Sequence, residues 1–355
     1  MDQANTDKKF LLRCAQLAGL GDAKVSNNPF VGALLVYDNR IIGEGFHRRA
    51  GTAHAEVNCL ASVREADRPL IAESTLYISL EPCCVTGRTG ACTDVIRAHG
   101  IPRVVFAQRD ATPGVDGRSV RILRAAGVEV AEYPHFTPTL LPNAHRRVLT
   151  LKQRPRVTLK WARSADGFLR PADREQAYWL TNAFSRRLVH RWRANTAAVI
   201  VGGRTVVEDD PALTTRLFFG PNPVPVVVDP RNRVTGRERV FVDHPRRALL
   251  FAGSERPDVD ADVAVVPGLG KRALTQVLTE LAQRGLGQLT VEGGARVLEA
   301  FLSAGYWDEA RVFTGRQRLG GGLPAPALPA AAQHRTTERI GTDTLRSYTN
   351  PQTPD

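Results

Sequence analysis

Several signals that are common in enzymes of this size are missing from the sequence. It contains no complete GxGxxG dinucleotide loop, no Walker loop and no internal repeat, so any nucleotide cofactor must be held by other means. The first apolar run, FLLRCAQLAGL, includes Arg13, is shorter than the ~18 apolar residues that a membrane span needs, and has no signal-type cleavage site. We therefore expect a cytoplasmic protein without a membrane partner.

Cysteine is absent after residue 92. All five cysteines lie in the first part of the chain, and five is an odd number. This distribution argues against a disulfide framework and favours metal or thiol chemistry in the first half. The second half must work without cysteine.

Lysine is also scarce, although the chain is basic. The formal net charge of +12 depends on arginine, since few of the 48 basic residues are lysines. Arginine is suited to bidentate contacts with phosphate. A phosphorylated substrate, a nucleic acid or a basic surface with no specific partner would each explain the charge.

The length of 355 residues predicts two domains, because a single core rarely serves a chain of this size. Helical and strand patterns alternate up to about residue 130, which predicts an α/β sandwich, with strands over 30–38, 40–47, 75–80, 103–108 and 128–133. Segment 134–156 contains prolines and has no period of its own, so we place the boundary there and assign residues 1–150 and 151–355 to the two domains. A second α/β domain follows, with strands over 156–167, 197–203, 224–229, 248–253, 263–267 and 286–294.

The residues of the first half include a candidate zinc site. The segment HAEV supplies His54 and Glu56, and the segments PCC and AC supply thiols at Cys83 and Cys92. A hydrolytic zinc site needs three protein ligands and one open position, and a glutamate that is not a ligand can carry protons. An H-x-E element followed by a P-C element is typical of zinc deaminases, although eight residues separate the two cysteines here.

With these motifs the sequence resembles the bifunctional riboflavin-biosynthesis deaminase/reductases over nearly its whole length. The N-terminal landmarks are NPFVGALLV, IIGEGFHRRAGTAHAEV and LEPCCVTGRTGAC, in that order. The resemblance implies a cytidine-deaminase-like α/β/α sandwich with His54, Cys83 and Cys92 as zinc ligands and Glu56 as the catalytic residue. It also implies that Cys84 is not a ligand. Asn28, His47 and Arg88 would bind the pyrimidine and its ribose phosphate.

The second half resembles the same family through LKWARSADG, YWLTN, RWRANTAAVIVGGRTVVEDDPALTTR, VVVD and VEGGARVLEAFL. The resemblance implies a dihydrofolate-reductase-like α/β domain that binds NADPH without a GxGxxG loop. The implied substrate-binding residues are Lys160, Arg193, Leu213, Arg216 and Glu292. The implied cofactor-binding residues are Ala162, Trp179, Thr205, Asp209, Gly293 and Gly294. The Gly-rich turn before a helix start, taken alone, also fits an ordinary tight turn.

Together these features predict a two-step enzyme that deaminates a phosphorylated diaminopyrimidinone ribosylamine and then reduces its ribosyl group to ribityl with NADPH. We expect a homo-oligomer that does not bind nucleic acid. The alternative enzyme class is a nucleic-acid base deaminase with a basic accessory domain, against which the long inter-cysteine loop and DDPALTTR argue. A zinc-stabilised binding module is a third class, against which Glu56 beside an open zinc position argues.

Overall fold

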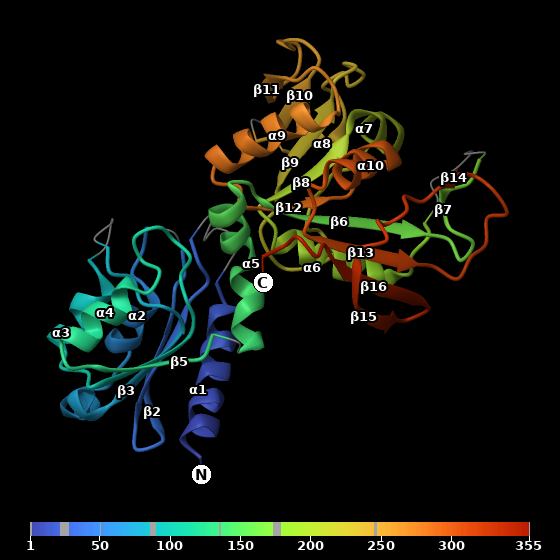
Figure 1. The fold of residues 1–355 in the computed structure, drawn as a ribbon. Helices are drawn as coiled ribbons and strands as arrows, with labels where there is room; N and C mark the ends of the chain where they lie inside the picture. Colours follow the sequence, from blue (N-terminus) through green and yellow to red (C-terminus); the bar gives the residue numbers. More distant parts are fainter. Residues whose placement is uncertain are drawn as a thin grey trace. The chain divides into compact units, whose positions relative to one another are not determined.

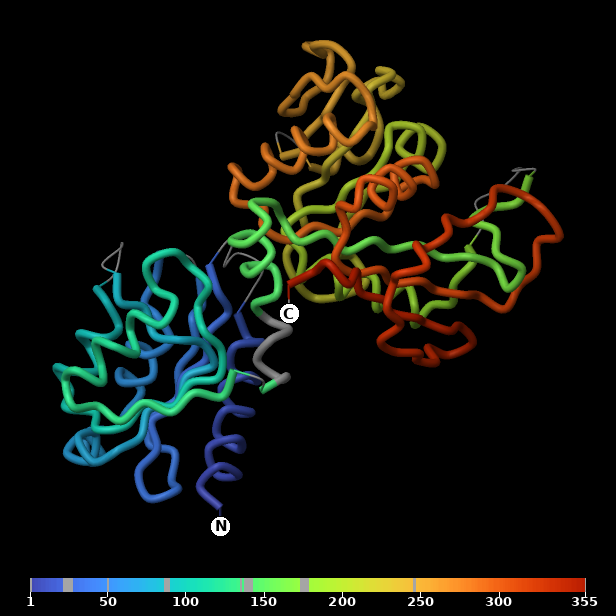
Figure 2. The backbone as a smooth tube through the Cα atoms, viewed as in Figure 1, coloured from blue at the N-terminus to red at the C-terminus, as the bar shows by residue number. Residues whose placement is uncertain are grey.

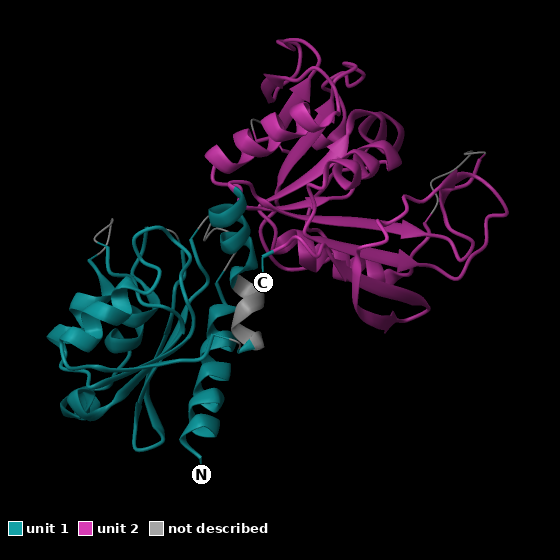
Figure 3. Ribbon diagram, viewed as in Figure 1, with its two compact units in different colours: residues 1–152, 354–355 teal, residues 153–353 magenta. Residues whose placement is uncertain are grey.

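The computed structural model describes residues 2–21, 28–49, 51–85, 90–134, 136–172, 179–244 and 247–354, with the backbone alone for 137–142. The chain divides into two compact units, one of residues 1–152 with 354–355 and one of residues 153–353 (Figure 3). Within the described ranges, no helix is both long enough and apolar enough to cross a bilayer.

The first unit is built on a five-stranded sheet in the order β2-β1-β3-β4-β5 (Figure 1). Its strands are β1 (Gly32–Tyr37), β2 (Arg40–Phe46), β3 (Thr75–Leu80), β4 (Arg103–Gln108) and β5 (Glu129–Glu132). Strand β1 runs antiparallel to β2 and β3, whereas β3, β4 and β5 are parallel. Strands β1 and β2 form a hairpin that turns at Asp38 and Asn39, whose φ angles of 44° and 58° match the two-residue turn that hairpins favour.

Helices cover both faces of this sheet. Residues of α2 (Ala55–Ala61), α3 (Cys92–Ala98) and α4 (Arg118–Ala125) share one buried cluster with alternate strand residues such as Ile78 and Phe106. The opposite strand residues, such as Tyr77 and Val105, pack against α1 (Gln3–Ala18). A 3-10 helix, η2 (Glu65–Glu73), precedes β3. This layering follows from the alternation of side chains along a strand.

The segment that we predicted to be irregular around the boundary is a helix, α5 (Thr137–Lys152), which lies beside α1 (Figures 1 and 2). That prediction was wrong because prolines 138 and 142 fall in the first two turns, where the helix loses few hydrogen bonds to proline. A polar contact also anchors the helix. The buried Asn143 side chain accepts from the Phe30 N–H at 2.7 Å and donates to the Phe30 carbonyl oxygen at 2.8 Å.

The second unit contains a nine-stranded sheet in the order β11-β10-β9-β8-β12-β6-β13-β16-β15 and a separate pair, β14-β7 (Figure 1). The strands are β6 (Arg156–Arg163), β7 (Phe168–Arg170), β8 (Ala198–Gly202), β9 (Val224–Asp229), β10 (Leu249–Ala252), β11 (Asp262–Val265), β12 (Gln288–Val291), β13 (Glu309–Thr314), β14 (Leu323–Pro324), β15 (Gln333–Ile340) and β16 (Asp343–Thr349). The helices are α6 (Ala183–Ala194), α7 (Gly203–Asp209), α8 (Arg239–Val242), α9 (Lys271–Gln283) and α10 (Ala295–Ala304).

The sequence patterns located six strands of this sheet, β6 and β8 to β12, but not the strands that follow α10. Strand β15 shows why. All its residues except the last are exposed, and it lies at the edge of the sheet, so it has no apolar alternation.

Candidate active sites

Three predicted metal ligands meet at one end of the first unit's sheet. His54 is the residue before α2, Cys83 follows β3, and Cys92 is the first residue of α3. Their ligand atoms all lie within 4.8 Å of one another. His54 Nδ1 is 3.2 Å from Cys92 Sγ and 3.5 Å from Cys83 Sγ.

These separations suit a zinc ion. Tetrahedral bonds of about 2.1 Å to nitrogen and about 2.3 Å to sulfur place the two donor atoms about 3.5 Å apart. One imidazole and two thiols are also the donor types that zinc prefers. Cys84 has a different neighbour, since its Sγ lies 3.5 Å from the Gly114 carbonyl oxygen.

Glu56 lies in the first turn of α2, beside this group. The residue is only 3% exposed, and its carboxyl is close enough to Cys83 and His54 to interact with them electrostatically. Burial raises the pKa of the Glu56 carboxyl above its ordinary value. A carboxyl beside a hydrolytic metal site can carry a proton between water and a leaving group.

Asn28 and His47 join the same site. His47 Nδ1 lies 3.1 Å from the Ala53 carbonyl oxygen, which can only accept, so Nδ1 carries the proton and donates it. His47 Nε2 then accepts from Asn28 Nδ2 at 3.2 Å. The rings of His47 and His54 meet edge to face, with centroids 5.6 Å apart. The predicted substrate residue Arg88 lies outside the described residues.

In the second unit, three predicted substrate residues form a partly buried charge cluster. Glu292 accepts from Lys160 Nζ at 3.1 Å and from Arg193 Nε and Nη2 at 2.8 and 2.9 Å. Arg193 Nη1 donates to the Thr214 carbonyl oxygen at 3.1 Å. Burial alone would raise the pKa of Glu292, but Arg193 and Lys160 outweigh burial and hold that pKa below its ordinary value. Glu292 is therefore a carboxylate at neutral pH.

Two further residues, Arg216 and His190, lie near this cluster. Arg216 adds a positive charge, and His190 adds a neutral ring. Burial, then Arg193 and Arg239, lowers the pKa of Arg216, which reflects its crowding by like charges. Burial, then Arg193 and Arg216, lowers the pKa of His190 to about 4, so its ring is neutral at pH 7. The Leu217 N–H donates to His190 Nδ1 at 3.5 Å. The excess of guanidinium groups over carboxylates favours a bound anion.

Leu213 lies next to this cluster in a rare backbone conformation. Its φ is 50° and its side chain is buried. A branched residue with positive φ costs about 1–3 kcal/mol, and such residues concentrate at functional sites. The preceding carbonyl, that of Ala212, accepts from the buried His244 Nε2 at 2.7 Å, which helps to hold the turn.

Three of the predicted cofactor residues, Thr205, Gly293 and Gly294, meet where β8 and β12 lie side by side. Strand β8 connects through α7 to β9 on one side, and β12 connects through α10 to β13 on the other. Ligands of open α/β sheets bind at such a switch point. A Cβ on Gly293 would come within 2.6 Å of Val201 Cα, and one on Gly294 within 2.9 Å of Thr205 Oγ1. These glycines keep the two strand ends close together and leave the first N–H groups of α10 accessible to a phosphate.

The remaining cofactor predictions fall at separate positions. Ala162 is on β6 two residues after Lys160, so both side chains point to one face of the sheet. Asp209 is the last residue of α7. Trp179 is 58% exposed, with Arg186 Cζ 4.9 Å from its ring centroid.

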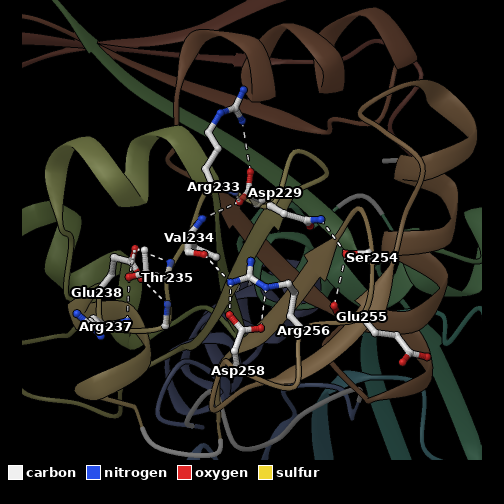
Figure 4. A network of polar contacts seen from close by, with 12 residues as sticks. Asp229, Arg233, Val234, Thr235, Arg237, Glu238, Ser254, Glu255, Arg256 and Asp258 are labelled. Carbon is white, nitrogen blue, oxygen red and sulfur yellow. Dashed lines mark hydrogen bonds and ion pairs between the residues drawn. The ribbon is translucent and has the colours of Figure 1, made fainter.

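The sequence did not predict the polar network at the end of β9 (Figure 4). Asp229 is fully buried and accepts from the backbone N–H groups of Arg233 and Val234. Arg256 Nη2 donates to the Val234 carbonyl oxygen at 2.8 Å. The Asp229 carboxylate occupies the space that a side chain on Gly203 would need, so it packs against the first residue of α7. The only sequence signal was the aspartate that ends the apolar strand VPVVVD.

Comparison with known proteins finds a family match for each unit. Residues 4–108 match the model of the cytidine and deoxycytidylate deaminase zinc-binding region, and residues 155–345 match that of the RibD C-terminal domain. The riboflavin biosynthesis protein RibD of Aquifex aeolicus is 34% identical over 326 residues, which are 89% of this chain and 89% of the relative. RibD of Escherichia coli is 32% identical over 331 residues, 88% of this chain and 89% of the relative.

Solved structures agree as well. A diaminohydroxyphosphoribosylaminopyrimidine deaminase/5-amino-6-(5-phosphoribosylamino)uracil reductase from Thermotoga maritima superposes with a TM-score of 0.87 at 33% identity, covering 97% of this chain and 99% of that one. RibD of Acinetobacter baumannii gives a TM-score of 0.87 at 28% identity, covering 98% and 99%. The predicted fold class is confirmed, a cytidine-deaminase-like unit followed by a dihydrofolate-reductase-like unit, and so are the predicted cofactors, zinc and NADPH. The chain belongs to the RibD family of bifunctional riboflavin-biosynthesis deaminase/reductases.

Proposed function

We propose that two separate groups of residues carry the two reactions of this family. The first unit hydrolyses the 2-amino group of 2,5-diamino-6-(5-phosphoribosylamino)pyrimidin-4-one, and the second reduces the ribosyl group of the product to ribityl. The observation that carries the proposal is the set of His54, Cys83 and Cys92, with the buried Glu56 two residues after His54. That set provides three ligands and a proton carrier, which is what a hydrolytic zinc site requires.

For deamination, His54, Cys83 and Cys92 would hold the zinc ion. Zinc, when bound, supplies a Lewis acid that makes water nucleophilic at neutral pH. Glu56 takes a proton from the attacking water and passes it to the departing amino group, so a C–O bond forms, the C–N bond breaks and ammonia leaves. Asn28 and His47 orient the pyrimidine, because their mutual hydrogen bond fixes the ring of His47 next to His54.

For reduction, the cluster of Lys160, Arg193 and Glu292 orients the ribosyl group, and Arg216 binds its phosphate. NADPH, when bound, supplies the hydride. Gly293 and Gly294 offer backbone N–H groups to a cofactor phosphate, with Thr205 beside them. No side chain needs to act as a strong acid or base here, because hydride transfer depends mainly on positioning.

Removal of zinc is the experiment that tests this division of labour. Chelator-treated full-length enzyme is expected to lose ammonia release and to regain it when zinc is restored. NADPH oxidation with the already deaminated intermediate is expected to continue at close to the untreated rate, because the second unit has no part in holding the metal. Loss of both activities on chelation, with the protein still folded by circular dichroism, would refute separate sites.

The phosphate role of Arg216 predicts a selective loss of substrate affinity. Arg216→Ala is expected to raise the KM for the deaminated intermediate by about 10- to 100-fold and to leave the KM for NADPH nearly unchanged. This factor corresponds to the binding free energy that a charged hydrogen-bond pair contributes. Arg335→Ala, on the exposed edge strand β15, is the matched control and is expected to change neither constant. An equal rise in both KM values for Arg216→Ala would contradict the phosphate role and assign Arg216 to cofactor binding.

The remaining parts of the proposal concern the partners and the compartment. We propose a cytoplasmic enzyme, because all five cysteines are free thiols, which a reducing compartment preserves. We also propose a homo-oligomer, since Leu217, Phe218 and Phe219 form a consecutive exposed apolar stretch that self-association would cover. Light scattering of the purified protein would give its mass in solution.

A further inference from the structure

A buried carboxylate that the reactions above do not use lies next to the proposed zinc ligands. Glu81 directly follows β3, is only 2% exposed and is separated from Cys83 by one residue, Pro82. We propose that Glu81 is a positioning residue of the deaminase site, which fixes the turn that carries Cys83. This inference rests on the proposed assignment of His54, Cys83 and Cys92 as the zinc ligands.

Among the described residues, the hydrogen bonds of Glu81 go to one neighbouring segment, which comprises the last residue of β4, the loop after it and the start of α4. Its Oε2 accepts from the backbone N–H groups of Asp110 at 3.3 Å and Gly117 at 3.1 Å. Its Oε1 accepts from the Ser119 hydroxyl. Its backbone N–H donates to the Gln108 carbonyl oxygen at 2.6 Å. Glu81 therefore ties the end of β3 to the segment that follows β4.

Cys83 is held from the other side by α3. Its carbonyl oxygen accepts from the Thr93 N–H at 3.1 Å, and its Sγ accepts from the Cys92 N–H at 3.3 Å. Cys84 adds a contact to the segment that Glu81 binds, through the Gly114 carbonyl oxygen. The short turn between these two attachments has little freedom, so the Glu81 anchor sets where Cys83 Sγ lies relative to His54 Nδ1.

The geometry assigns this role to hydrogen bonding and not to charge. Glutamine at position 81 could accept both backbone N–H groups through its single oxygen and donate its amide to Ser119, whose hydroxyl can also accept. Alanine would leave the buried Asp110 N–H, the partly buried Gly117 N–H and the buried Ser119 hydroxyl without their acceptor. The two substitutions therefore separate loss of the charge from loss of the anchor.

The experiment measures zinc affinity in the full chain by competition with a chelator, and the absorption spectrum of the cobalt-substituted protein. Glu81→Ala is expected to weaken zinc binding by about 10- to 100-fold, the usual effect of losing an outer partner of a ligand, and to shift the cobalt bands. Glu81→Gln is expected to stay within a few-fold of the parent in affinity, with the parent spectrum. Glu238→Ala is the matched control, because Glu238 accepts from the N–H groups of Thr235 and Gly236 in the other unit.

Three results would overturn the inference. Parent-like affinity and cobalt spectrum in Glu81→Ala would show that the anchor does not position Cys83, and equal losses in Glu81→Ala and Glu81→Gln would show that the charge matters instead. If Glu81→Ala does not fold, Ser119→Ala takes its place, with a few-fold loss of affinity expected and an unchanged affinity contradicting the role. A parent protein that holds no zinc would instead refute the ligand assignment on which the inference rests.

Discussion

Glu56→Gln is expected to release ammonia from the diaminopyrimidinone substrate about 10²- to 10⁴-fold more slowly than the parent enzyme. The amide has nearly the shape of the carboxylate, so zinc content and fold should be unchanged, but it cannot take a proton from water and pass it to the departing amino group. Ammonia measured at saturating substrate, with zinc quantified in the same sample, separates this loss of proton transfer from a loss of metal.

The same variant also tests whether the two sites are independent. Supplied with the deaminated intermediate, Glu56→Gln should oxidise NADPH at close to the parent rate. Asp209→Ala is the reciprocal variant, because the family resemblance implies that Asp209, the last residue of α7, binds the cofactor, and it should release ammonia normally while NADPH oxidation falls. If folded, zinc-loaded Glu56→Gln failed to reduce the intermediate, a shared site or obligatory coupling would replace the two-site account.

Cys83→Ser is expected to lose most of its zinc and with it ammonia release, whereas Cys84→Ser should retain one zinc per chain. The reason is geometric, since Cys83 Sγ lies 3.5 Å from His54 Nδ1 and Cys84 Sγ is directed to the Gly114 carbonyl oxygen. A serine hydroxyl is a far weaker zinc ligand than a thiolate at neutral pH.

The neighbouring cysteines serve as controls for each other, because each variant replaces one sulfur with oxygen at adjacent positions. Metal analysis of both purified variants, after dialysis against zinc-free buffer, gives the comparison directly. If Cys83→Ser retained zinc and Cys84→Ser lost it, Cys84 and not Cys83 would be the zinc ligand. The chain after Pro82 would then have to follow a different path.

The strands that the sequence predicted best are those buried on both faces of the sheet. The predicted ranges 75–80, 103–108 and 224–229 are the bounds of β3, β4 and β9, because an apolar run between turn residues is a strong signal for a parallel strand. Helix α5 and strand β15 gave no such signal. The first is anchored by a polar side chain, Asn143, and the second is exposed along its length.

The two sites differ in how far local sequence reveals them. His54 and Glu56 are two residues apart at one helix start, so their spacing itself points to metal chemistry. Lys160, Arg193 and Glu292 come from three distant parts of the chain, and only family resemblance suggested them before the structure showed them in contact. The sequence did not predict the role of Glu81, because the partners of its side-chain hydrogen bonds lie about 30 or more residues further along the chain.

We propose that one chain performs hydrolytic deamination first and NADPH-dependent reduction second. The most direct test incubates the purified protein with the diaminopyrimidinone ribosylamine phosphate, with and without NADPH, and follows ammonia and NADPH together. The account predicts one ammonia per substrate without NADPH, and with NADPH one equivalent oxidised per ammonia, never ahead of ammonia release. NADPH oxidation that precedes or exceeds ammonia release, or no ammonia from the zinc-loaded enzyme, would contradict it.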